Sequence, residues 1–172
     1  MSANNISLRL PNSLIELIDE VVILLKQDEN FMVLTSINRS LVIRLLTLKG
    51  LGEFERQFGL MPPGVNPEPF DEALVIKGRK TKTNHVLYRI NVYYPDWMLT
   101  RLNKVTYLTF ESIDEKLFTK KQVSRLWVIR NCIDHGLQLF ARETPDFDDH
   151  GYLNSPTYLK YLRMIEELSQ TS

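Results

Sequence analysis

The sequence is poor in the features that usually mark secreted, membrane-spanning or disulfide-bonded proteins. It has a single cysteine, Cys132, which excludes an intrachain disulfide framework and fits a reducing compartment. No apolar run approaches the roughly 20 residues that a membrane span needs. The polar N-terminus lacks the charged and apolar regions of a secretory signal. We therefore expect a cytoplasmic protein that has no membrane partner.

Patterns that are typical of catalytic sites are also missing. His85, His135 and His150 do not lie at metal-ligand spacings with cysteines or carboxylates. The sequence has no glycine-rich phosphate loop and no nucleophile elbow. We interpret the acidic cluster at 146–149 as solvated acid, and Cys132 as a small core residue. The protein is therefore expected to be neither an enzyme nor a cofactor-binding protein.

The formal net charge is zero, but the charge is unevenly distributed. Residues 77–142 hold 13 Lys and Arg against 5 Asp and Glu, a balance of +8. Residues 1–76 hold 6 against 10 and residues 143–172 hold 2 against 6, a balance of −4 each. Global charge thus argues neither for nor against a polyanionic partner, whereas the distribution makes one part of the chain basic.

Two segments of the chain are copies of each other. Residues 42–56, VIRLLTLKGLGEFER, match residues 128–142, VIRNCIDHGLQLFAR, at 7 of 15 positions and an offset of 86. Both segments are predicted helices, and each carries Ile, Gly and Phe on one face. A glycine in mid-helix costs about 1 kcal/mol relative to alanine. Its presence at the same place in both copies predicts a close backbone approach to another helix.

A strand pattern is repeated as well. ISLRLP at 6–11 and RINVYYP at 89–95 both alternate apolar with polar residues and both end in proline, at an offset of 84. Each repeat is therefore a strand, a helix, a loop and a second helix. As N-caps of the four helices we expect Asn12 or Ser13, Thr35 or Ser36, Asp96, and Thr119 with Gln122 as a capping box.

Short motifs at the start of each duplicated helix carry a family resemblance. The first match is Asn38-Arg39-Ser40 with Ile43-Arg44, and the second is Ser124-Arg125 with Ile129-Arg130. Together with the ISLRLP-type strand, they resemble the ribbon-helix-helix family of DNA-binding proteins, the class of the Arc and MetJ repressors. The second match is less complete, because Leu126 replaces a serine.

The resemblance implies a mostly α fold with one two-stranded antiparallel ribbon, arranged as a tandem ribbon-helix-helix intramolecular pseudo-dimer with an added C-terminal helix. The alternative is that each unit pairs with another chain. Unit 1 spans residues 4–56, a proline-rich and then basic linker spans 57–84, unit 2 spans 85–142, and an acidic turn with the C-terminal helix spans 143–172. Both units are expected in one compact domain.

The resemblance also assigns candidate contacts to DNA. Side chains on the outward strand face would contact base edges: Asn5, Ser7, Arg9, Arg89, Asn91 and Tyr93. Residues near the start of each second helix would contact phosphates: Ser36, Asn38, Thr119, Lys120 and Lys121. The basic linker residues Lys77, Arg79, Lys80 and Lys82 either track the DNA backbone or are simply solvated.

These features together predict a sequence-specific, nucleoid-associated double-stranded DNA-binding protein. It would be a transcriptional regulator or an accessory factor in plasmid transfer or partition, and it would recognise an asymmetric site because the two strands differ. The alternative is a protein-interaction module in which residues 156–168 bind a second copy or another protein; otherwise this helix covers the core. An antitoxin is a third interpretation, disfavoured by the short and partly apolar tail.

Overall fold

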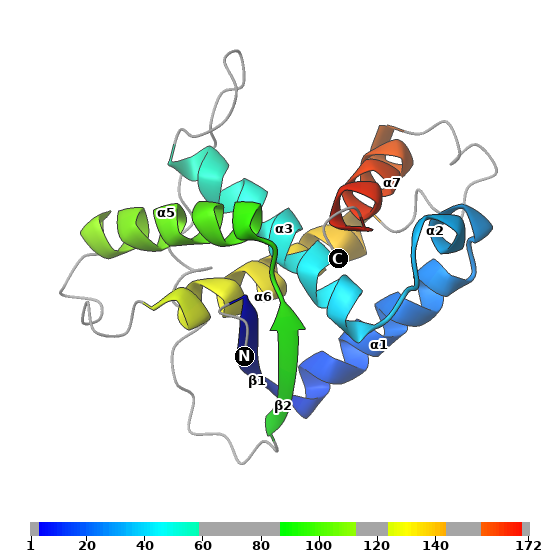
Figure 1. Ribbon diagram of the computed structural model, residues 1–172, viewed down its shortest axis with the longest axis horizontal. Helices are drawn as coiled ribbons and strands as arrows, with labels where there is room; N and C mark the ends of the chain where they lie inside the picture. Colours follow the sequence, from blue (N-terminus) through cyan, green and yellow to red (C-terminus); the bar gives the residue numbers. More distant parts are fainter. Residues whose placement is uncertain (1–3, 59–86, 113–123, 144–155, 170–172) are drawn as a thin grey trace.

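The computed structural model describes residues 4–58, 87–112, 124–143 and 156–169. This part of the chain is mostly helical, with one two-stranded antiparallel sheet, which confirms the expected fold class at that level (Figure 1). The elements in chain order are β1 (Asn5–Pro11), α1 (Asn12–Lys26), α2 (Glu29–Leu34), α3 (Arg39–Gln57), β2 (Leu87–Tyr93), α5 (Asp96–Ser112), α6 (Arg125–Glu143) and α7 (Pro156–Ser169).

In the strand register, Ser7 of β1 stands opposite Asn91 of β2. Ser7 and Asn91 are 84 residues apart, which is also the offset between the two strand sequences. The alternation predicted from the sequence is confirmed: the inward-facing side chains Ile6, Leu8, Leu10 and Val92 are buried, and Ile90 is half-buried. Because strand side chains alternate between faces, the polar residues between them share the opposite, exposed face.

The closest helix contact is the crossing of α3 and α6, near the centre of the molecule (Figure 1). A Cβ atom added to Gly50 would lie 2.0 Å from the carbonyl oxygen of Cys132, and one added to Gly136 would lie 2.0 Å from that of Leu46. Gly50 and Gly136 are 86 residues apart, and so are Leu46 and Cys132. The contact is therefore reciprocal between equivalent positions, and the close backbone approach predicted from the two glycines is confirmed.

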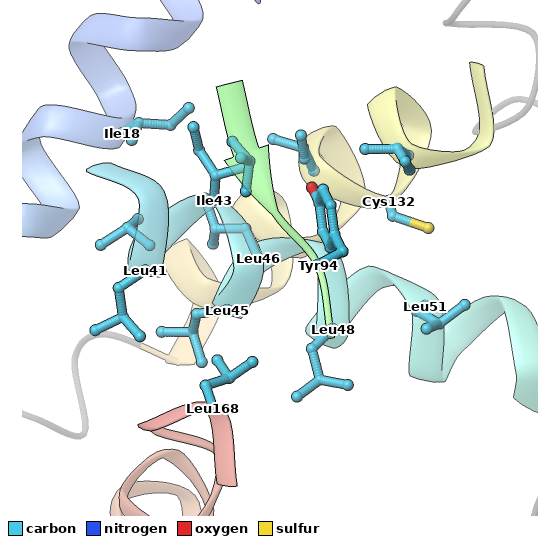
Figure 2. Packing of buried hydrophobic residues seen from close by; sticks show 14 of the residues in the cluster. Ile18, Leu41, Ile43, Leu45, Leu46, Leu48, Leu51, Tyr94, Cys132 and Leu168 are labelled. Carbon is cyan, nitrogen blue, oxygen red and sulfur yellow. The ribbon is translucent and has the colours of Figure 1, made fainter. Parts of the chain in front are cut away.

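The core lies around this crossing. Figure 2 shows apolar side chains of α1, α3, α6 and α7 packed in one cluster with Tyr94. The Tyr94 hydroxyl is 2.9 Å from Oγ1 of Thr47, which itself donates to the carbonyl of Ile43 at 2.6 Å. Tyr94 is therefore the donor in the first bond, so both buried hydroxyls are satisfied.

Helix α7 packs against α2 and α3 and covers part of the core. Tyr161, Ile165 and Leu168 are fully buried, which confirms the docking interpretation of this segment. The Tyr161 hydroxyl donates to Oε2 of Glu143 at 2.6 Å, and Nζ of Lys49 lies 2.9 Å from Oε1 of the same carboxylate. This ion-paired cluster links α7 to both α3 and α6.

Two of the expected helix caps are wrong. α1 begins directly after Pro11 with no side-chain cap, so neither Asn12 nor Ser13 caps it. The proline ends the strand in an extended conformation, and its fixed φ suits the position just before a helix. Asp96 is the first residue of α5, and its Oδ1 accepts a hydrogen bond from Nδ2 of Asn4 at 2.7 Å instead.

The two duplicated helices also begin later than expected. The short helix α2, which was not predicted, occupies the chain before α3 and buries Phe31. Asn38, not Thr35 or Ser36, then caps α3. In the second repeat, α6 begins at Arg125 rather than near Thr119.

Candidate nucleic-acid interface

The six predicted base-contacting residues lie together on the outer face of the ribbon. The strand register arranges them as three cross-strand pairs: Asn5 with Tyr93, Ser7 with Asn91, and Arg9 with Arg89. Five of these side chains are exposed, and Ser7 is partly exposed. The face thus presents guanidinium, amide, hydroxyl and phenol groups, which include the donors that discriminate base edges in the major groove.

Two arginines stand directly opposite each other on this face. Arg9 pairs with Arg89 across the strands, and Nε of Arg89 donates to Oγ of Ser7 at 2.9 Å. Within the described parts of the chain, neither guanidinium is ion-paired with a carboxylate. Like charges directly opposite each other destabilise a strand pair. The outer face of the ribbon therefore holds uncompensated positive charge.

The two duplicated helices begin with equivalent caps. Oδ1 of Asn38 accepts from the backbone N–H of Leu41 at 2.9 Å, and Oγ of Ser124 accepts from that of Trp127 at 3.2 Å. Both caps bond to the third residue that follows, and they are 86 residues apart. The remaining free N–H groups and the helix dipole make each start a position that favours an anion.

Of the predicted phosphate contacts, Asn38 lies at such a start, and Ser36 is exposed two residues before it. The capping role of Ser124 was missed, because the Thr119–Gln122 pattern was interpreted as the helix start. The repeat offset applied to Asn38 would have identified Ser124. Thr119, Lys120 and Lys121 lie outside the described residues, as do the linker residues Lys77, Arg79, Lys80 and Lys82.

The arginine that follows each cap has a different partner in the two repeats. Arg39 forms a bidentate ion pair with Asp19, with Nε–Oδ1 and Nη2–Oδ2 distances of 2.7 and 2.8 Å. The hydrogen bond from Arg39 lowers the pKa of Asp19 and correspondingly raises the pKa of Arg39. Nη1 of Arg125 instead donates to Oδ1 of Asn103 at 3.4 Å. Asp19 and Asn103 are 84 residues apart, so equivalent positions supply a carboxylate to one arginine and an uncharged amide to the other.

A charged cleft of about 610 Å³ lies elsewhere, between α3, α5, α6 and α7. Its lining includes the Lys49–Glu143 ion pair and the bidentate pair between Arg101 and Glu55. We interpret these groups as structural ion pairs between helices, and none of the predicted site residues lies there.

The described residues were also compared with the requirements of a metal site, a reactive thiol and a membrane span. No group of three or more His, Cys, Asp and Glu side chains there is placed to hold a metal ion. Cys132 is fully buried, and burial raises the pKa of its thiol, as suits a core residue. None of the described helices combines the length and apolar character needed to cross a membrane.

Comparison of the chain with protein-family models, curated proteins and solved structures gave no match, so the candidate interface rests on its own geometry.

Proposed function

We propose that the protein is a sequence-specific double-stranded DNA-binding protein that inserts its two-stranded ribbon into the major groove. In this proposal the chain is a tandem ribbon-helix-helix pseudo-dimer. Its cellular role would be transcriptional regulation, or an accessory role in plasmid transfer or partition. A two-stranded ribbon is one of the two protein elements whose width fits the major groove.

Reciprocal contacts between the repeats support the pseudo-dimer. In a pair related by an approximate two-fold axis, equivalent residues meet at the axis and other contacts occur twice. Ser7 faces its own counterpart Asn91, while the glycine contacts at the α3–α6 crossing and the caps of these helices all occur as equivalent pairs. A pairing of unrelated segments would have no reason to follow the repeat offsets of 84 and 86.

The observation that carries the proposal is the exposed, opposed pair Arg9 and Arg89. Their mutual repulsion costs stability in the free protein, and an anionic, acceptor-rich partner would remove that cost. DNA supplies both properties, since guanine presents two acceptors to a guanidinium and the phosphates supply negative charge. The amide of Asn91 beside them is suited to adenine.

The helix starts supply the positioning contacts in this proposal. The N-termini of α3 and α6, capped by Asn38 and Ser124, would each take a DNA phosphate. The two half-sites would differ, because the outward triplet of β1 is Asn5, Ser7, Arg9 and that of β2 is Arg89, Asn91, Tyr93. The bound sequence should therefore be asymmetric rather than palindromic.

The test is a selection from a pool of genomic fragments, followed by titration of the selected fragments at several salt concentrations. We expect selected complexes whose affinity falls steeply as salt rises. Arg9→Ala or Asn91→Ala should each weaken binding by about 1–3 kcal/mol, the contribution of one good base contact. Arg163→Ala, which removes the same charge from an exposed position on α7, is the matched control for Arg9→Ala. Equal binding of all fragments by all the variants would contradict the proposal.

The alternative, a protein-interaction module that binds a partner through α7, would have only part of the apolar surface of this helix available. The most buried side chains of α7, Tyr161, Ile165 and Leu168, already contact the chain's own core, and Leu159 is left exposed. Undetectable DNA binding at low salt, together with capture of a partner that Leu159→Ala abolishes, would favour that alternative over the DNA-binding proposal.

A further inference from the structure

A hollow of about 290 Å³ lies on one flank of the ribbon, between β1 and the first turns of α6. Its lining residues are Ser7, Leu8, Arg9 and Leu10 from β1, and Leu126, Trp127 and Arg130 from α6. Leu8 and Leu10 are buried, whereas Leu126 is 50% exposed although it is apolar. The hollow is therefore an apolar surface beside two guanidiniums, located between the proposed base-contacting face and the proposed phosphate-contacting helix start.

The equivalent flank of the other strand is built from different residues. Tyr93 and Tyr94 occupy the positions that correspond to Arg9 and Leu10, while Ser40 and Arg44 correspond to Leu126 and Arg130. Arg44 is only 8% exposed, and burial lowers the pKa of its guanidinium, whereas the side chain of Arg130 is 35% exposed and its Nε lies 3.8 Å from Oδ2 of Asp134. The combination of an exposed leucine with the exposed Arg9 and the half-buried Arg130, which is ion-paired with Asp134, thus belongs to the β1 flank.

This combination matches one group of double-stranded DNA. A half-exposed leucine beside the ribbon would enter the major groove with it, and the 5-methyl group of thymine is the apolar group that base pairs present there. Arg9, on the rim of the same hollow, is placed to form a bidentate contact with a neighbouring guanine. Burial of the methyl against Leu126 and Trp127 would remove apolar surface on both sides from water.

We propose that this hollow receives the 5-methyl group of a thymine, at one position of one half-site, next to a guanine that Arg9 contacts. The inference rests on the proposed DNA-binding function and adds a specificity-determining residue, Leu126. The other half-site, where Ser40 stands in its place, should lack this thymine preference.

The experiment uses a fragment selected by the full-length protein, in which each thymine is replaced by deoxyuridine in turn. Deoxyuridine lacks only the 5-methyl group, so hydrogen bonding and charge are unchanged. We expect affinity to fall by about fourfold at one position, as for the loss of one buried methyl group. Leu126→Ser should bind the thymine and deoxyuridine fragments equally, whereas Leu126→Met and Ser40→Ala should keep the difference.

The possible outcomes separate this inference from the function on which it rests. If fragments are selected and Arg9→Ala weakens binding, but no deoxyuridine position matters, the thymine subsite is refuted and DNA binding stands. A deoxyuridine effect that persists unchanged in Leu126→Ser also refutes the subsite. If the pool yields no selected fragment, both proposals fail. Thermal melting of Leu126→Ser beside the wild type shows whether its loss of discrimination comes from the site or from unfolding.

Discussion

Replacement of Gly50 by alanine tests the closest contact in the structure. The added Cβ would lie 2.0 Å from the carbonyl oxygen of Cys132, 2.6 Å from its carbonyl carbon and 2.7 Å from its Cα. All three atoms are backbone, so no side-chain rotation relieves the clash. α3 and α6 would have to separate by more than about 1 Å to reach an ordinary van der Waals distance.

The free-energy cost follows from the position of this contact at the centre of the core. Overpacking of a well-packed core costs about 1–3 kcal/mol, and a backbone–backbone clash belongs at the upper end. Alanine regains about 1 kcal/mol of helix propensity. We expect Gly50→Ala to lower the free energy of unfolding by about 2 kcal/mol or more, and Tm by at least about 4–8 °C for a chain of this size. Gly136→Ala should behave alike, since it meets Leu46 at the same distance.

Gly52 provides the matched control, because it lies in the same helix and nothing lies within 4 Å of its added Cβ. Gly52→Ala should therefore raise the free energy of unfolding by about 0.5–1 kcal/mol through helix propensity alone. Urea unfolding followed by far-ultraviolet circular dichroism measures all three variants. If Gly50→Ala is as stable as the wild type, or both alanines at 50 and 52 stabilise equally, the tight crossing of α3 and α6 is wrong.

Three further predictions concern the core, pH and the thiol. Tyr94→Phe should lower the free energy of unfolding, measured in urea, by about 1 kcal/mol. Thr47→Val should lower it by about 1–3 kcal/mol, because it leaves the buried Tyr94 hydroxyl without its acceptor. A larger loss in Tyr94→Phe than in Thr47→Val would contradict the hydrogen-bond assignment. The pKa of Asp19 is lowered in the folded state, so its stabilisation is present above its unfolded value of 3.8 and is lost as pH falls through the lowered value. In Asp19→Asn the free energy of unfolding should no longer fall at acid pH through this group, a difference of at most about 1 kcal/mol for so exposed an ion pair. If the variant shows the same dependence of stability on pH as the wild type, the Asp19–Arg39 pair does not stabilise the fold. Cys132 is buried and its pKa is raised, so a thiol reagent should modify it only after unfolding; fast labelling of the native protein would contradict its position.

The sequence was informative wherever a short period or a repeat encoded the structure. Alternation of apolar and polar residues predicted both strands and the face that each buries. The duplicated glycine predicted the helix crossing, since it was identified as a position where a side chain would obstruct packing. These are cases in which the local pattern and the tertiary contact agree.

The sequence was misleading wherever tertiary packing decides between competing local signals. The Thr119–Gln122 pattern resembles a capping box, yet α6 begins at Arg125. In the tail, the side chains of Tyr161, Ile165 and Leu168 are fully buried. Helix α7 packs against α3 and also against α2, a helix that was not predicted, so the sequence alone did not show this contact.

The candidate interface also has features that the sequence predicted and features that depend on tertiary packing. Alternation placed the six outward residues on one face, but it did not show which residues stand opposite each other, because register depends on two segments about 84 residues apart. The opposed arginines and the hollow beside Leu126 emerge only from that register. The different partners of Arg39 and Arg125 could have been predicted, because Asp19 and Asn103 stand at equivalent positions of the two repeats.

The ion pair between Arg101 and Glu55 gives a physical reason why the two repeats should pair with each other rather than with themselves. Arg101 corresponds to Leu17 in the first repeat, and Glu55 corresponds to Ala141 in the second. Two first repeats paired in the same geometry would set Glu55, whose side chain is only 13% exposed here, against Leu17. Two second repeats would likewise set Arg101 against Ala141. The first self-pairing would leave the largely desolvated carboxylate of Glu55 without its partner, a penalty that the mixed pairing avoids. The second would leave Arg101 unpaired at a smaller cost, because its side chain is 36% exposed.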